Sequence, residues 1–266
     1  MASAKARAAA VVDELRGLGA ERNRAGMARY GINVEEAFGV SIQQLRPIAR
    51  RLGRDHALAA ALWDSGVHEA RILACFVDDP DAVTPAQMEA WAAAFDSWDV
   101  CDQACTALFD LTPHAWSKAS AWSRRRDAWV KRAGFSLMAG LASHDVAAAD
   151  RDFLALLPHI EDGAFDERNY VKKAVSWALR NVGKRNRALH RAAAACAGRI
   201  RAEADARAGG PRGGSPDERA ARWVAADVLR ELADPRTVAR LEATEARLQR
   251  RRSADARLRR AARTGR

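Results

Sequence analysis

Apolar residues recur every three or four positions through most of this chain, which is the spacing of one face of an α-helix. The stretch 171–182 shows the pattern best, because its apolar positions fall on a single face at about 100° per residue. Alternation of β-branched residues, typical of strands, is essentially missing, and glycine or proline interrupts the pattern at intervals. The pattern predicts an all-α protein with helices over 3–17, 41–52, 56–64, 67–78, 85–95, 98–111, 113–122, 126–141, 149–160, 167–182, 186–205, 217–233 and 235–259.

One of these helices has a large aromatic residue on a face that the core does not use. Trp177 points away from the apolar stripe of 171–182 and shares its face with cations. An aromatic ring among positive charges suits a ligand that is flat and anionic, and nucleic acid fits that description. The residues predicted to contact DNA from this face are Tyr170, Lys173, Arg180 and Lys184.

Two earlier helices repeat the arrangement. In the segment 98–111, Trp98 and Asp102 are four residues apart, so they are neighbours on a face other than the apolar one. In the helix that begins near Asp127, Trp129 is expected to be buried and Arg132 to project away from the buried residues. If the three helices stand side by side, these surfaces merge into one concave, aromatic and basic site with a single buried carboxylate.

Three short motifs occur in a fixed order along these helices. They are Trp98-Asp99-Val100-Cys101-Asp102, Trp129-Val130-Lys131-Arg132 and Trp177-Ala178-Leu179-Arg180. In this order and at these separations they resemble the AlkD-like family of DNA glycosylases, over a stretch from about residue 27 to about residue 199. The resemblance implies a HEAT-like or armadillo-type α-solenoid of stacked antiparallel helix pairs with a concave basic face.

The same resemblance implies a function. Members of the family hydrolyse the N-glycosidic bond of alkylated purines in duplex DNA, chiefly N3- or N7-alkylated bases that are positively charged. Trp98 and Trp177 match the aromatic residues that flank the lesion, and Asp102 matches the catalytic carboxylate. Arg132 matches an arginine that contacts the DNA backbone. Lys131, which stands where the family commonly has an arginine, is a further predicted DNA contact.

The chemistry of a cationic purine agrees with a single carboxylate. Such a base leaves as a neutral purine, so it needs no acid to protonate it, unlike the leaving group of a two-carboxylate glycoside hydrolase. Aromatic faces can hold the cation, and Asp102 can stabilise the positive charge that develops on the sugar or orient water. Asp99 faces about 100° away from Trp98 on the same helix, so it has at most a minor role.

Neither a metal nor another cofactor is predicted. The four cysteines form no CxxC motif, and the six histidines show no spacing typical of zinc ligands. Cys101 and Cys105 are expected to be small apolar fillers. The chain has neither a GxGxxG sequence nor a P-loop, so no nucleotide cofactor is implied.

The net charge says little about the folded body. The chain of 266 residues has a net charge of +10, but from residue 236 onward it has 11 arginines and 3 acidic residues. Two domains are predicted: a HEAT-like repeat solenoid over 1–235, with a net charge of about +2, and an Arg-rich helical or disordered tail over 236–266. Non-specific phosphate contacts or a solvated, frayed helix end would each account for the tail.

Without a signal peptide or an apolar span long enough to cross a membrane, the protein is expected to be cytoplasmic, with reduced thiols and no membrane partner. It is also expected to be a monomer that binds double-stranded DNA containing alkylated bases. Two other functions remain open, a catalytically silent HEAT-like protein that binds damaged or branched DNA and a protein–protein scaffold. Asp102 favours catalysis over silent binding, and the cations around Trp177 favour DNA over a protein partner.

Overall fold

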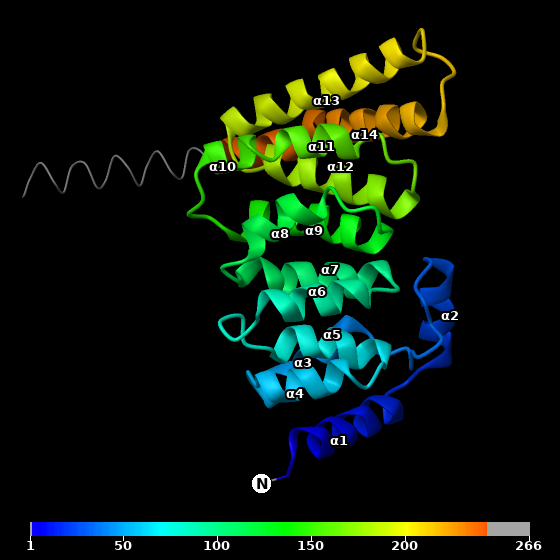
Figure 1. Cartoon of the computed structure of the whole chain (residues 1–266), viewed down its shortest axis with the longest axis vertical. Helices are drawn as coiled ribbons and strands as arrows, with labels where there is room; N and C mark the ends of the chain where they lie inside the picture. Colours follow the sequence, from blue (N-terminus) through cyan, green and yellow to red (C-terminus); the bar gives the residue numbers. More distant parts are fainter. Residues whose placement is uncertain (1, 244–266) are drawn as a thin grey trace, which may run out of the picture.

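The computed structural model describes residues 2–243, which form helices and loops but no strand. The helices stack in layers from α1 at one end to α13 and α14 at the other (Figure 1). The predicted all-α solenoid is therefore confirmed. The elements are α1 (Ala4–Gly17), α2 (Glu21–Arg29), α3 (Ile42–Leu52), α4 (His56–Trp63), α5 (His68–Val77), α6 (Pro85–Ala93), α7 (Trp98–Ala107), the 3₁₀ turn η1 (Phe109–Leu111), α8 (Ala115–Trp122), α9 (Ala128–His144), α10 (Asp150–Leu154), α11 (Leu157–Gly163), α12 (Asn169–Gly183), α13 (Arg187–Arg207) and α14 (Pro216–Ala233).

Most helix boundaries lie within a few residues of those predicted, and three segments differ. The segment that forms α2 was not predicted to be helical, because none of its residues is buried and it has no apolar stripe. The predicted helix 98–111 ends at Ala107 and continues as η1, and the predicted helix 149–160 is divided into α10 and α11. Of the predicted helix 235–259, residues 235–243 are helical, and the remainder lies outside the described residues, as does most of the predicted tail 236–266.

Alternate helices form an inner layer that positions the sequence motifs. In this layer α3, α5, α7, α9, α12 and α14 pack each against the next, while α4, α8 and α13 cover α5, α9 and α14 from the other side. The central member is α9, in which every residue from 132 to 142 is buried. Because α7, α8 and α12 surround it, α9 has no free face over this stretch.

A glycine allows the close approach of α8 to α9. A Cβ atom on Gly134 would lie 2.4 Å from the backbone nitrogen of Ser123 and 2.8 Å from the carbonyl carbon of Trp122. Both are backbone atoms, which cannot rotate away as a flexible side chain would. Any larger residue at position 134 must therefore push the two helices apart.

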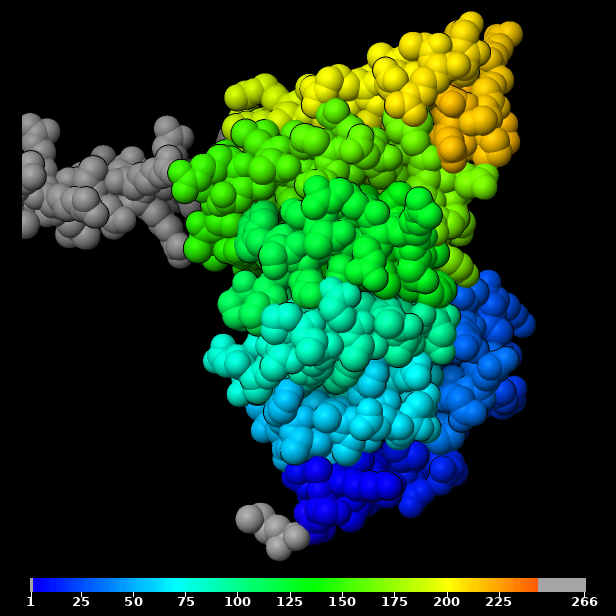
Figure 2. Space-filling model, viewed as in Figure 1, coloured from blue at the N-terminus to red at the C-terminus, as the bar shows by residue number. Residues whose placement is uncertain are grey.

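The helix α2 lies along the side of the stack, roughly perpendicular to the other helices (Figure 1). In Figure 2 this side of the molecule is hollowed between α2, in blue, and α14, in orange. The end of α2 is fixed by two aromatic side chains of the inner layer. The indole Nε1 of Trp98 donates a hydrogen bond to the Tyr30 carbonyl at 3.0 Å, and the hydroxyl of Tyr170 donates to the Gly31 carbonyl at 3.1 Å.

A buried carboxylate fixes the loop that follows α2. Glu69, at the start of α5, has no exposed surface, and it accepts hydrogen bonds from the backbone N–H groups of Phe38, Gly39 and Val40 at 2.6–3.1 Å. These bonds satisfy a charge that could not otherwise be buried. Within residues 2–243, no helix has both the length and the apolar character that a bilayer crossing needs.

We expect opposite effects on stability from two glycine substitutions within helices. Gly134→Ala should lower the free energy of unfolding by about 1–3 kcal/mol, because the new methyl group meets backbone atoms of α8. Gly198→Ala in α13 is the matched control, because its Cβ would meet nothing within 4 Å. This change should raise the free energy of unfolding by about 0.5–1 kcal/mol through helix propensity. Urea denaturation of both variants measures the two effects, and a Gly134→Ala protein as stable as wild type would disprove the close approach.

Candidate functional site

The first two sequence motifs, on α7 and α9, lie beside Tyr170 in the first turn of α12, whereas the third motif, Trp177 to Arg180, begins two turns further along α12. Trp98 opens α7 and Asp102 follows it by one turn. Arg132 lies in the second turn of the neighbouring helix α9, and Tyr170 lies in the first turn of α12. The side-by-side packing of α7, α9 and α12, on which the predicted site depends, is thus present.

A buried ion pair lies at the centre of this arrangement. Arg132 donates two hydrogen bonds to Asp102, from Nε to Oδ1 at 3.0 Å and from Nη2 to Oδ2 at 2.7 Å. Its Nη1 donates to the carbonyl of Tyr170 at 2.6 Å, and the hydroxyl of Ser136 donates to Oδ1 of Asp102 at 2.7 Å. The side chain of Arg132 is only 6% exposed and that of Asp102 only 14%. One guanidinium therefore joins α7, α9 and α12.

This geometry corrects the prediction for Arg132. The sequence placed its side chain away from the buried residues, but it is buried between two neighbouring helices. The apolar stripe of α9 misleads here, because a helix enclosed on both sides also buries its polar positions. Trp129, predicted to be buried, is only partly buried and stacks on Tyr170 with ring centroids 4.9 Å apart.

Burial and hydrogen bonding act in opposite directions on the acid. Burial raises the pKa of Asp102 above its ordinary value, while the charge of Arg132 and the hydrogen bonds from Arg132 and Ser136 oppose the rise. For Arg132, burial disfavours the charge, but Asp102 outweighs it and raises the pKa of the guanidinium. Three donated hydrogen bonds favour the ionised form of Asp102 over a protonated acid, which would bring its own proton into the same space.

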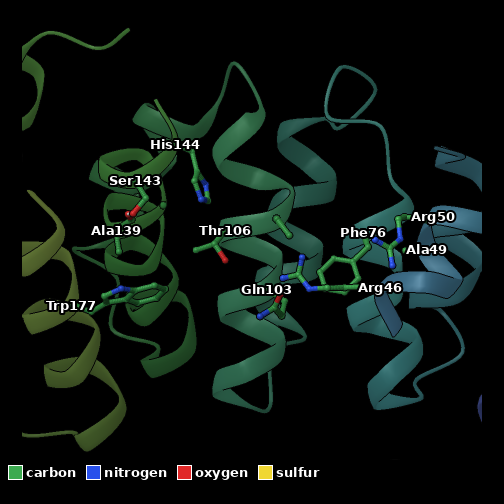
Figure 3. Close-up of a pocket in the computed structure, with 12 residues that line it drawn as sticks. Arg46, Ala49, Arg50, Phe76, Gln103, Thr106, Ala139, Ser143, His144 and Trp177 are labelled. Carbon is green, nitrogen blue, oxygen red and sulfur yellow. The ribbon is translucent and has the colours of Figure 1, made fainter. Parts of the chain in front are cut away.

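The two tryptophans line different cavities. Trp177 lines a groove of about 580 Å³ that runs across α3, α5, α7, α9 and α12, where its indole extends in front of α9 at the height of Gln103 (Figure 3). Trp98 lines a second hollow of about 840 Å³ against α2. Asp102 lines neither cavity, although Gln103, the next residue, lines the groove. The single merged site expected from the sequence is thus divided in this structure.

The groove beside Trp177 is basic. Among the described residues that line it there is no acid, and its charged or titratable members are Arg46, Arg50 and His144. Arg46 and Arg50 are exposed on α3, and the guanidinium of Arg46 lies 5.5 Å from the centre of the Phe76 ring. These two arginines were not among the DNA contacts predicted from the sequence. Their signal was present in the amphipathic helix 42–52, where they occupy polar positions four residues apart.

Most of the cations that the sequence predicted as DNA contacts are paired. Lys131 lies 2.8 Å from Asp166, whose burial is outweighed by hydrogen bonds from Arg168 and Lys131 that lower its pKa to about 2. On α12, Arg180 lies 3.6 Å from Asp227 and Lys184 lies 2.5 Å from Glu231, both acids of α14. Lys173 is exposed and makes no ion pair with any described residue. The remaining predicted contact, Tyr170, is half-buried and hydrogen-bonded to Gly31.

The chemistry of the described residues offers no cluster for a metal. Within 2–243, no three His, Cys, Asp or Glu side chains come together as a possible metal site. All four cysteines are free and buried, including Cys101 and Cys105 on α7, which donate weakly to carbonyls of α9. This placement agrees with their predicted role as small apolar fillers.

Comparisons of the sequence and of the structure with known proteins agree on one family. A family model described as "DNA alkylation repair enzyme" matches residues 11–203, which include all three motifs. One solved structure, described as "a new family of proteins related to the HEAT-like repeat DNA glycosylases with affinity for branched DNA structures", superposes with a TM-score of 0.65. It is 24% identical in sequence, and the match covers 71% of this chain and 81% of that chain. This likeness establishes a HEAT-like repeat fold. No curated protein matches the sequence.

We expect Asp102→Asn to destabilise the protein, in contrast to the neutral effect that an exposed carboxylate would predict. The substitution leaves Arg132 buried without its charged partner, which should lower the free energy of unfolding by about 3 kcal/mol. Glu231→Gln breaks a partly exposed pair with Lys184 and should lower it by less than about 1 kcal/mol. Adding Arg132→Met to Asp102→Asn should restore part of the loss. Equal melting temperatures for Asp102→Asn and Glu231→Gln would show that the central pair contributes no more to stability than the partly exposed pair.

Proposed function

The chain belongs to the family of DNA alkylation repair enzymes, and we propose that it is a DNA glycosylase that hydrolyses the N-glycosidic bond of cationic N3- or N7-alkylpurines in duplex DNA. One observation carries the proposal. The Asp102 carboxylate accepts hydrogen bonds from Arg132 and Ser136 of α9. Asp102 lies on α7, whose first residue is Trp98, and α9 separates α7 from α12, which holds Trp177. A fixed carboxylate and aromatic faces are the groups that the departure of a cationic base requires.

In this proposal the groove beside Trp177 binds the DNA backbone. Its lining includes two exposed arginines of α3 and no acid among the described residues, so it attracts a polyanion. Gln103 and Thr106 of α7 line its floor and add hydrogen-bonding groups. Lys173, exposed and one turn before Trp177 on α12, extends the positive surface. The face of Trp177 is then available to an alkylated base or to the sugar beside it.

The reaction breaks the bond between C1′ of the sugar and the purine nitrogen, and the bonding electrons go to the purine. The purine leaves neutral because alkylation had made it cationic, so no acid is required. Positive charge develops on the sugar, where Asp102 stabilises it or orients the water whose oxygen attacks C1′, and that water then loses a proton to the solvent. Arg132 and Ser136 act as positioning residues for Asp102. The ion pair makes this role a better fit for Arg132 than the phosphate contact expected from the sequence.

A second candidate is a catalytically silent protein that binds branched or damaged DNA. Asp102 favours this reading in one respect, since three hydrogen bonds already occupy its oxygens and it lines neither cavity. The solved relative is itself described as having affinity for branched DNA. A scaffold for proteins is a weaker candidate, because the groove is basic where apolar anchors would be expected. Steeply salt-dependent binding to duplex DNA separates both DNA functions from a scaffold.

We further propose that the protein works in the cytoplasm as a monomer. All four cysteines are free and buried, as expected where thiols stay reduced. Cell fractionation and analytical ultracentrifugation measure these two properties directly.

Incubation with methylated duplex DNA tests the reaction. We expect release of N3- or N7-methylpurine, detected by chromatography, in the presence and absence of a chelator. Under single turnover, Asp102→Asn should reduce excision by about 10²-fold or more, the scale of losing one preorganised electrostatic group. Glu231→Gln should excise at the wild-type rate, and both variants are assayed well below their melting temperatures. Tight DNA binding without any released base would contradict the proposed glycosylase activity and favour the catalytically silent DNA-binding function.

The pH profile of a Ser136 variant tests the positioning role. Ser136→Ala removes a hydrogen bond that lowers the pKa of Asp102, so that pKa should rise. The carboxylate is then protonated at higher pH, and excision should fall off on the acid side at a higher pH than in wild type. At neutral pH the rate should fall by about 3- to 10-fold, the worth of one hydrogen bond. A lower rate with an unchanged pH profile would mean that Ser136 has only a structural role.

A further inference from the structure

A histidine at the end of α9 stands between a basic and an acidic hollow. His144 lines the groove beside Trp177 together with Arg46 and Arg50. It also lines a smaller hollow of about 470 Å³ whose acids are Asp81, Asp110 and Asp145. In Figure 3 its ring hangs into the groove between Ser143 and Thr106.

One ring nitrogen of His144 is fixed by a buried acid. Its Nδ1 lies 2.6 Å from Oδ2 of Asp110, whose side chain is fully buried while the imidazole is 48% exposed. The other oxygen of Asp110 is buried and has no hydrogen-bond partner among the described residues, so His144 is the side chain that satisfies this acid. Burial raises the pKa of Asp110, and the contact with His144 opposes that rise.

The chain is shaped to allow this pair. A Cβ atom on Gly140, one turn before His144, would lie 2.7 Å from Oδ2 of Asp110, so only glycine leaves room for the carboxylate against α9. The carboxylate comes from η1, at the far end of α7 from Trp98. With Nδ1 bound to Asp110, the free nitrogen Nε2 is on the edge of the ring away from that acid. The same imidazole, 48% exposed, lines the groove and extends into it (Figure 3).

We infer that His144, in its protonated form, is a phosphate-binding residue of the groove and makes DNA binding dependent on pH. The inference rests on the proposal that this groove binds DNA. When both nitrogens are protonated, Nδ1–H donates to Asp110 and Nε2–H donates to a phosphate oxygen of the strand. When the ring is neutral, Nδ1–H still donates to Asp110, and Nε2 presents a lone pair that repels the phosphate.

The charges around His144 agree with this role. The acids of the smaller hollow and the negative, C-terminal end of α9 lie beside the imidazole. Arg46 and Arg50 line the groove with it, and a bound phosphate would neutralise part of their charge. From the end of α12, Arg185 binds the carbonyls of Ala142 and Asp145 and takes some of the negative potential of the helix terminus. Phosphate binding and protonation of His144 therefore support each other.

Fluorescence anisotropy with an unmodified, labelled duplex tests the inference at constant ionic strength. Wild-type protein should bind about 3- to 10-fold more tightly at pH 6 than at pH 8. Its salt slope at pH 6 should be larger by roughly one phosphate contact. His144→Gln should bind at both values of pH as wild type does at pH 8, and His144→Lys as wild type does at pH 6. His114→Gln, which alters the histidine that directly precedes α8 and lies outside the groove, should keep the wild-type pH dependence.

The inference is wrong if His144→Gln keeps the full pH dependence, or if wild type shows none. Nuclear magnetic resonance of histidine ring carbons in wild-type protein gives a second test that needs no folded variant. The pKa of one histidine should rise when the duplex is added, and a titration unchanged by DNA at all six histidines would overturn the assignment. Excision is measured separately with methylated duplex, so failure of the glycosylase activity is distinguished from failure of this contact.

Discussion

A guanidinium taken out of water needs a carboxylate beside it, and in this protein that requirement ties three helices together. Arg132 of α9 binds Asp102 of α7 with two hydrogen bonds and reaches the Tyr170 carbonyl of α12 with a third. Loss of either charge would leave the other buried and unpaired, which is among the most destabilising changes a core can suffer. The pair thereby fixes how far α7, α9 and α12 are shifted along one another, and with that the positions of Trp98 and Trp177.

The same pairing principle decides where the surface is positive. Along α12 the cations Arg180 and Lys184 form ion pairs with acids of α14, so their charge is largely neutralised within the protein. Arg46 and Arg50 of α3 have no acid among the described lining of their groove. The positive charge that lines the groove therefore comes from α3, at Arg46 and Arg50, and α12 adds the exposed Lys173. A long polyanion would then contact the inner layer from α3 to α12 rather than α12 alone.

Sequence periodicity was enough to predict the helices and the all-α class, because those depend on apolar stripes that each helix shows by itself. It was enough to select Trp98, Asp102 and Trp177 as residues outside the stripes. It could not predict the burial of Arg132, because a helix enclosed by neighbours on both sides buries polar positions that its own pattern assigns to solvent. Nor could it predict α2, whose position depends on hydrogen bonds from Trp98 and Tyr170 and on no buried residue of its own. Partners that come from distant helices leave no mark in local spacing.

The bond from Tyr170 to Gly31 spans 139 residues in a fold whose other contacts run mostly between neighbouring layers. In an open solenoid, stability adds up repeat by repeat, and each end can unfold independently of the other. Here α2 closes a circuit with α12 through the layers between them. Unfolding of α12 breaks one of the two aromatic hydrogen bonds that fix the end of α2, so hydrogen exchange near Gly31 should respond to the opening of α12 as well as to that of nearer elements. The closure also raises the contact order, so this part of the chain should complete its folding late, when both ends of the circuit are in place.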